Sequence, residues 1–254
     1  MRLPVLTNRP ILGTFGKGID GSVSINFCQS GGKYCDKDCA YHPQSNVDSS
    51  LKGSCYAVRL EARGPRKNLR TKLVRHSRTK PENVARRALS ELNQLHDAGI
   101  AIPWVRVSTA GSVPNPHQAT PGFIEALKEL LEWCMDKEIP VHFPVETKAK
   151  AAFYRTKLAW RVVVRESCTN YQRFMDTGSA ATIVAGDETM NRIERVIAAK
   201  KVAKDRMEST GRRTVVCPAV ASRYLNNNIP NDKAKCGNCT ACALPNVDVV
   251  YPLH

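Results

Sequence analysis

The chain has 254 residues and a formal net charge of +15 at neutral pH. A chain of this length buries a full hydrophobic core without cross-links, so its ten cysteines are not needed for stability. We find no apolar run long enough for a signal peptide or a membrane span, so we expect a cytoplasmic protein without a membrane partner. In that reducing compartment, cysteines more often bind metal than form disulfides.

The positive charge favours a polyanionic partner, a nucleic acid or a nucleotide. Between Arg59 and Lys80 there are nine lysines or arginines and a single acid, Glu61. A solvated helix face has the same composition, so both interpretations stay open. The candidate nucleic-acid contacts in this stretch are Arg59, Arg63, Arg66, Lys67 and Arg70.

The expected elements alternate along the chain. Residues 1–56 predict loops and short strands, and Thr79 with Glu82 predicts a capping box for a helix that stops near Gly99. Apolar periodicity then predicts helices from Thr120, over 148–157 and over 187–207. Predicted strands cover residues 102–108, 140–146, 160–165, 181–185 and 214–217, and 226–254 reads as loop.

This alternation predicts an α/β fold: a partial or complete (β/α) barrel of mostly parallel strands, or an open doubly wound sheet. In both architectures, ligands bind at the carboxyl ends of the strands. We divide the chain into a cysteine-rich, metal-binding segment (1–56), an α/β core (57–216) and a second cysteine-rich, metal-binding segment (217–254).

The C-terminal cysteines have the sharper spacing. Cys236-Gly-Asn-Cys239-Thr-Ala-Cys242 is a C-x2-C-x2-C run, and Cys217-Pro218 supplies a fourth thiol followed by proline. This pattern resembles that of bacterial ferredoxins and favours a [4Fe–4S] cluster. A tetrahedral zinc site is the alternative.

The N-terminal group comprises Cys28, Cys35, Cys39 and Cys55. Cys35 and Cys39 begin a C-x3-C-x2-C pattern, but its third position is His42. Either His42 is a ligand or Cys28 or Cys55 is the third thiolate, and we favour Cys55. A closed structural site that uses all four cysteines is an equal alternative.

Several short motifs together resemble a known family. Cys55-Tyr-Ala57, the strand Val105-Arg-Val-Ser108 with Ala110-Gly111-Ser112, Glu146-Thr-Lys148, Cys217-Pro218 and the terminal cysteine run occur in this order. The order resembles the phage gene-product-eighty-eight family and, more distantly, radical S-adenosylmethionine barrels. The resemblance implies a phage origin, an iron–sulfur barrel with one or two clusters, and S-adenosylmethionine bound near Ala110, Gly111 and Ser112.

Other polar residues follow predicted strands. Glu146 and Lys148 share a face if the strand continues through them, and His117 lies in a proline-rich loop near the expected mouth. These three are the candidate catalytic groups. Arg106 and Arg165 are candidate ligands for phosphate or carboxylate, with structural ion pairing as the alternative.

Three functions are consistent with these patterns. The first is a radical-S-adenosylmethionine-like iron–sulfur enzyme acting on a nucleic acid or nucleotide. The second is a nucleic-acid-binding protein whose metal sites, zinc or iron–sulfur, only hold loops. The third is a two-cluster electron-transfer or redox-sensing protein.

Overall fold

The structure is a computed structural model. It describes residues 11–14, 23–29, 31–35, 37, 39, 67–108, 112–168, 170–187, 189–225, 239 and 241–253. Within these residues the chain forms an α/β fold around one sheet, in the strand order β1-β2-β3-β4-β5-β6-β8-β7. The strands are β1 (Gly13–Thr14), β2 (Val23–Ile25), β3 (Val105–Val107), β4 (Val141–Val145), β5 (Val164–Cys168), β6 (Ala181–Ala185), β7 (Arg213–Val216) and β8 (Val247–Pro252).

All the pairings from β2 to β7 are parallel, and β1 adds to β2 in the antiparallel direction. Parallel neighbours need crossover connections, and these are mostly helical. The helices are α2 (Lys67–Arg78), α3 (Pro81–Asp97), α4 (Pro121–Asp136), α5 (Lys148–Leu158), α6 (Tyr171–Asp176), α7 (Arg192–Thr210) and α8 (Pro218–Leu225), with 3-10 turns η2 (Ala159–Arg161) and η4 (Ala241–Ala243).

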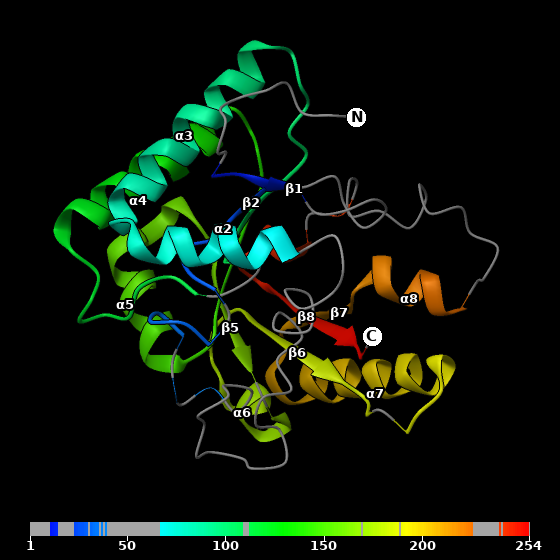
Figure 1. The fold of residues 1–254 in the computed structure, drawn as a ribbon. Helices are drawn as coiled ribbons and strands as arrows, with labels where there is room; N and C mark the ends of the chain where they lie inside the picture. The colour runs from blue at the N-terminus through cyan, green and yellow to red at the C-terminus, as the bar shows by residue number, and fades with distance from the viewer. Residues whose placement is uncertain are drawn as a thin grey trace.

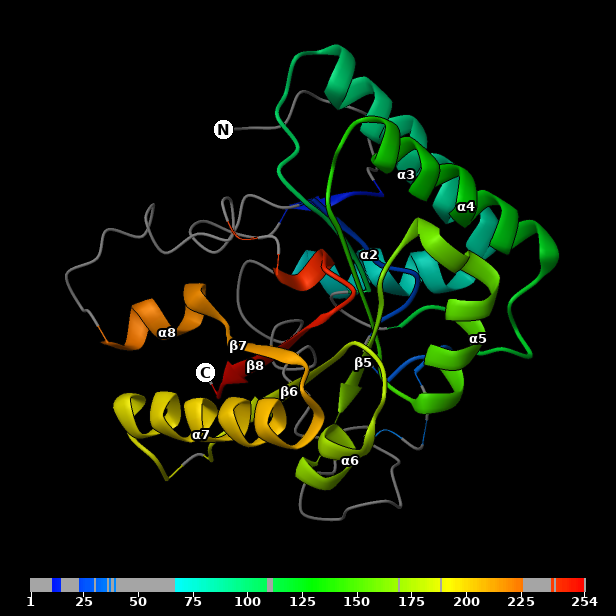
Figure 2. The same ribbon diagram turned by 180° about the vertical axis from the view of Figure 1, so that it is seen from behind.

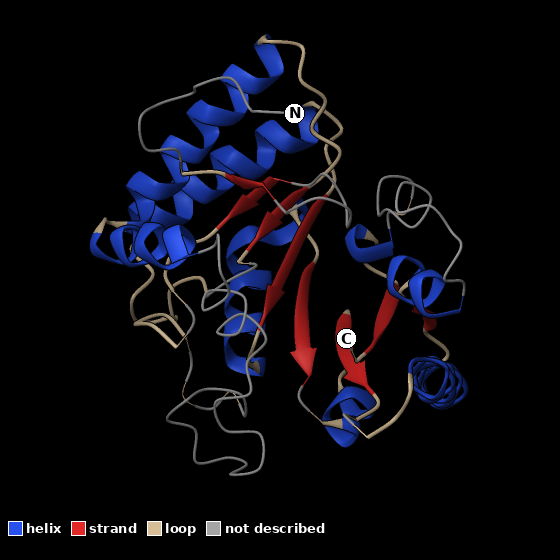
Figure 3. Cartoon of the chain, turned by 45° about the vertical axis from the view of Figure 1, so that its right-hand side comes forward, coloured by secondary structure: helices blue, strands red, loops and turns tan. Residues whose placement is uncertain are grey.

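The sheet is curved, and most of its helices lie along the outer side (Figure 3). The helices α3 and α4 run side by side at one end of the molecule, and α7 lies at the other (Figures 1 and 2). Strands β1 and β7 are at opposite ends of the strand order, so the described sheet is compatible with a partial barrel. The sheet takes strands from all three of the segments defined from the sequence.

Alternating residues give the sheet two different faces. In β4, Val141 and Phe143 join the hydrophobic core under the helices, whereas His142 between them points to the other, inner face. In β8, Val250 packs with residues of α7 on the outer side, and Val249 packs with Cys217 on the inner side. The inner face is therefore where strand residues can meet the cysteine-bearing segments.

Two predicted helix starts can be compared with the structure. Thr120 caps α4 as expected, and its hydroxyl accepts a hydrogen bond from the Phe123 N–H. The capping box at Thr79 is wrong: α3 starts after Lys80, and the Thr79 hydroxyl donates to the Arg75 carbonyl at the end of α2. The predicted stop at Gly99 is confirmed by its left-handed backbone, with φ of 69°.

The predicted strand over 160–165 is displaced in the structure. Ala159 has a φ of 49°, which turns the chain into η2 and leaves Trp160 exposed before β5 begins at Val164. The loop prediction for 226–254 also missed β8, which inserts between β6 and β7. Strand β8, although it is last in the sequence, contributes Val249 to the inner face.

Candidate functional site: two thiol groups and the buried cations beside them

The first thiol group follows the carboxyl end of β2. Cys28 is fully buried, Cys35 and Cys39 are half-buried, and all three are free thiols. The Cys28 and Cys35 side chains are hydrogen-bonded to each other. Cys55 and His42 lie outside the described residues, so the structure leaves open which of them completes the group.

The environment favours the thiolate form of Cys28. The hydrogen bond from Cys35 lowers the pKa of Cys28, and the Ser112 N–H, 3.4 Å from the sulfur, adds to that shift against the cost of burial. The same contact with Cys28 raises the pKa of Cys35. The pair therefore holds its first negative charge at Cys28, and thiolates are the form in which cysteine binds metal.

Ser112 connects this thiol group to the next strand. Its hydroxyl donates to Glu146 Oε2 at 2.7 Å, directly after β4. Of the predicted cofactor-binding residues, Ala110 and Gly111 lie outside the described part of the chain. The structure thus brings together a predicted cofactor residue, a predicted metal ligand and a predicted catalytic carboxylate.

Lys150 completes the network, and sequence reasoning missed it. Its side chain is fully buried, and Nζ lies 2.6 Å from Glu146 Oε1 and 2.8 Å from Ser112 Oγ. It also donates to the carbonyls of Tyr34 and Val113, at 2.8 and 3.1 Å. Lys150 therefore fixes the two loops that carry Cys35 and Ser112.

The expectation that Glu146 and Lys148 share a strand face is wrong. The strand ends at Val145, and the Thr147 hydroxyl accepts a hydrogen bond from the Lys150 N–H to cap α5. Lys148 is consequently an exposed first-turn residue, which lines a surface pocket with Glu166 and Arg173. The only sequence signal for the true partner was the i,i+4 spacing of Glu146 and Lys150.

The second thiol group lies on the inner face near β7 and β8. Cys217 follows β7, and its N–H donates to the Val250 carbonyl at 2.8 Å. Cys242 sits in η4, with Sγ 3.1 Å from the Tyr251 hydroxyl. Tyr251 interacts electrostatically with both thiols, and Cys239 with Cys242. Cys217 and Cys242 therefore share one cluster, Cys239 is within electrostatic range of Cys242, and Cys236 lies outside the described residues.

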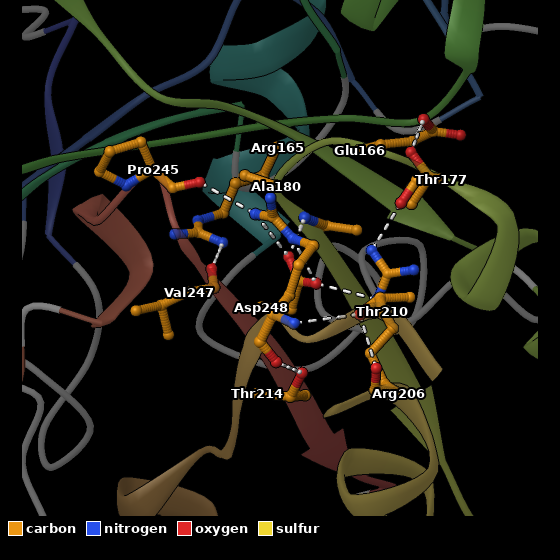
Figure 4. Close-up of polar contacts among 12 residues, drawn as sticks. Arg165, Glu166, Thr177, Ala180, Arg206, Thr210, Thr214, Pro245, Val247 and Asp248 are labelled. Atoms are coloured by element: carbon orange, nitrogen blue, oxygen red, sulfur yellow. Dashed lines mark hydrogen bonds and ion pairs between the residues drawn. The ribbon is translucent and has the colours of Figure 1, made fainter. Parts of the chain in front are cut away.

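Arg165 is the buried cation of this second group. Its guanidinium is fully enclosed, and its hydrogen bonds within the described part of the chain go to main-chain carbonyls, among them those of Cys242 and Val247. Figure 4 shows the guanidinium directed at Val247, beside the Asp248 carboxylate. The expectation that Arg165 contacts a nucleic acid is not supported, because no part of it reaches the surface.

The remaining candidates are dispersed. Arg106 is half-buried on β3 and close enough to Cys242 to affect its pKa. His117 is exposed on a turn of the loop after β3. Arg59, Arg63 and Arg66 lie outside the described residues, as do the side chains of Lys67 and Arg70 on α2.

The two solitary cysteines are core residues, as expected for Cys134. Cys134 packs inside α4, and Cys168 packs at the end of β5 with residues of α6 and α7. Burial raises the pKa of each thiol to about 12, so both remain protonated at neutral pH.

A complete metal site is not present within the described residues, since no three histidine, cysteine or acidic side chains there are arranged to hold an ion. Each proposed group has a cysteine beyond the described ranges, Cys55 or Cys236. In the part of the chain that the structure covers, every helix is too short or too polar to cross a bilayer.

Comparison of the chain with family models, with curated proteins and with solved structures finds no match. We therefore infer a function from the arrangement of the thiols and of the groups around them.

Proposed function

We propose that this chain is an iron–sulfur enzyme on a partial (β/α) barrel, of the phage, radical-S-adenosylmethionine-like type. Cys28, Cys35, Cys39 and Cys55 would hold the first cluster. Cys217, Cys236, Cys239 and Cys242 would hold the second. The carrying observation is that Cys28 contacts Cys35 and that Cys217 packs in one cluster with Cys242, each pair lying near a fully buried cation.

Contacts at the first thiol group support this proposal. Cys28 and Cys35 are reduced and adjacent, and the Ser112 N–H points at the Cys28 sulfur, the kind of hydrogen bond that tunes iron–sulfur centres. A zinc ion accepts the same thiolates, and zinc stays the alternative metal at either group.

The chain's own residues would do three things in this enzyme. The thiolates bind the metal, and Lys150 holds the Cys35 and Ser112 loops in one arrangement. Glu146 keeps the Lys150 charge balanced in the interior. A reduced cluster and S-adenosylmethionine, if held there, would supply one-electron cleavage of the sulfonium to methionine and a 5′-deoxyadenosyl radical.

The test is anaerobic loading with iron and sulfide, followed by S-adenosylmethionine and dithionite. We expect methionine and 5′-deoxyadenosine from the parent protein and none from Cys35→Ala. The matched control is Cys134→Ala, which removes a core thiol and should retain cleavage. Fully loaded parent protein that leaves S-adenosylmethionine intact would reject the enzyme and favour an electron-transfer or sensor role.

A nucleic acid or nucleotide is the proposed partner, and the net charge of +15 supports it. Among the described basic residues of α2, Lys72 is unsuited to such contacts, because its amine donates to the Leu12 carbonyl and burial lowers its pKa to about 8. Lys200, Lys201 and Lys204 of α7 are exposed, and Lys204 pairs with Glu208 at 3.7 Å.

A nucleic-acid-binding protein with purely structural metal sites is the second candidate. It predicts binding to single- or double-stranded oligonucleotides that weakens steeply with salt, because bound counterions are released. Fluorescence anisotropy across a salt series measures this slope. The absence of binding at low salt would remove both the second candidate and the nucleic-acid part of the first.

A further inference from the structure

Arg165 is a buried cation, and its hydrogen bonds to the described residues all go to carbonyl oxygens. From β5, its guanidinium donates to the carbonyls of Ala241, Cys242, Leu244 and Val247, at 2.5 to 2.8 Å. These carbonyls belong to η4, to Leu244 just after it and to the start of β8. One side chain thus fixes the whole segment that presents Cys242 to the inner face.

Among the residues that the structure describes, no carboxylate forms an ion pair with Arg165. The neighbouring Asp248 accepts from both Arg206 and Arg212, at 2.9 and 3.0 Å, so one anion already serves two cations. A buried ion without an opposite charge is costly, even when carbonyl dipoles surround it. The arrangement therefore calls for further negative charge close to Arg165.

The thiol group is the neighbour that can supply this charge. The Arg165 guanidinium donates to the Cys242 carbonyl at 2.6 Å, and Cys242 Sγ lies 3.1 Å from the Tyr251 hydroxyl. Cys217 is buried in the same cluster, with Tyr251 and Cys242 packed against it. Arg106 on β3 acts on Cys242 as well, so cations approach these sulfurs from two strands.

We propose that Arg165 is the positioning residue of the C-terminal thiol site, and that the charge of the guanidinium compensates an anionic metal–thiolate centre there. Four thiolates outweigh the positive charge of a zinc ion or a four-iron core, so either centre would be anionic. This inference rests on the proposed binding of metal by Cys217, Cys236, Cys239 and Cys242. It assigns Arg165 a role in positioning the metal centre and no role in binding a substrate.

The experiment isolates this site by working in a Cys28→Ala/Cys35→Ala background. Cobalt(II) is titrated anaerobically into that protein, and the thiolate-to-cobalt absorbance bands report both affinity and sulfur ligation. The variants are Arg165→Gln, which removes the charge and most of the carbonyl contacts, and Arg165→Lys, which keeps the charge. Far-UV circular dichroism checks that each is folded.

We expect Arg165→Gln to bind cobalt at least tenfold more weakly than the parent background, and Arg165→Lys to recover part of that loss. The matched control is Arg155→Gln. Arg155 also donates to two carbonyls, those of Val164 and Ala180, but lies away from the C-terminal thiols. Its variant should bind cobalt like the parent background.

The outcomes separate the two claims. A parent background that binds no cobalt through sulfur rejects the C-terminal metal site, and the role of Arg165 falls with it. A parent that binds, together with a folded Arg165→Gln variant of equal affinity, rejects the role of Arg165 alone. Should Arg165→Gln fail to fold, Arg165→Lys decides: an affinity within tenfold of that of Arg155→Gln supports charge compensation, and a larger loss overturns it.

Discussion

Lys150 Nζ lies 2.6 Å from Glu146 Oε1, and the lysine side chain is completely buried. The pair links the end of β4 to the first turn of α5 and, through Lys150, to the carbonyls of Tyr34 and Val113. A buried ion pair contributes little net stability, but removing one partner leaves the other charge uncompensated. This pair therefore makes the Cys28 and Cys35 loop dependent on one lysine.

The first prediction concerns that lysine. Lys150→Met removes the buried cation that pairs with Glu146 and its hydrogen bonds to two carbonyls, so we expect the free energy of unfolding to fall by about 3–5 kcal/mol. Urea denaturation followed by circular dichroism measures the change. Lys148→Met is the control, two residues away on the same helix but exposed, with an expected change below about 0.5 kcal/mol. Equal effects of the two variants would contradict the assigned network.

A second prediction concerns the buried carboxylate of β8. Asp248 is fully buried, and it accepts hydrogen bonds from Arg206, Arg212 and the Ala181 N–H. Asp248→Asn keeps the shape but leaves the Arg206 charge buried without an anion. We expect a loss of about 3–5 kcal/mol in the free energy of unfolding.

Glu208→Gln serves as the control for Asp248→Asn, because it removes an exposed carboxylate from the nearby helix α7. Its salt bridge to Lys204 is a surface pair, so the expected change is below about 1 kcal/mol. A mild effect of Asp248→Asn, comparable to that of Glu208→Gln, would show that β8 is not held by this cluster.

The third prediction concerns pH. Burial lowers the pKa of His76 to about 4 from its ordinary value of 6.5. As the pH falls below 6.5, His76 becomes protonated in the unfolded chain. In the folded protein it stays neutral until about pH 4. Stability is therefore lost between pH 6.5 and 4, by about 3 kcal/mol for this one group. Burial and two nearby arginines also lower the pKa of His142, which adds to the slope.

Urea midpoints measured every half pH unit test this. His76→Gln keeps a donor for the Asn26 carbonyl that His76 Nδ1 contacts, and it should flatten the decline between pH 6.5 and 4. Parallel curves for the parent and His76→Gln would contradict the assigned cause.

The sequence predicted the repeating part of the fold and missed what depends on remote partners. Apolar periodicity was sufficient for α4 and β4, since each presents one continuous hydrophobic face. Strand β8 was missed because Asp248 interrupts its apolar run, and its burial depends on arginines of α7 and the following loop.

The candidate site divides in the same way. Cys28 contacts Cys35, and Cys217 packs in one cluster with Cys242, but whether the cysteines bind metal as the spacing predicts stays a prediction. The buried cations could not be predicted. Lys150 and Arg165 resemble ordinary surface residues in the sequence, and only the carbonyls of distant loops explain their burial.

The most direct test of the account is the metal content of protein purified without oxygen. Two four-iron clusters predict a brown protein with about eight irons and matching sulfide. The iron content should fall by about half in Cys35→Ala or Cys242→Ala and stay unchanged in Cys134→Ala. A colourless protein with two zinc ions would leave the thiol sites but remove the iron–sulfur chemistry. A protein without metal, both as purified and after loading with iron and sulfide, would contradict the central claim that these thiols gather to bind metal.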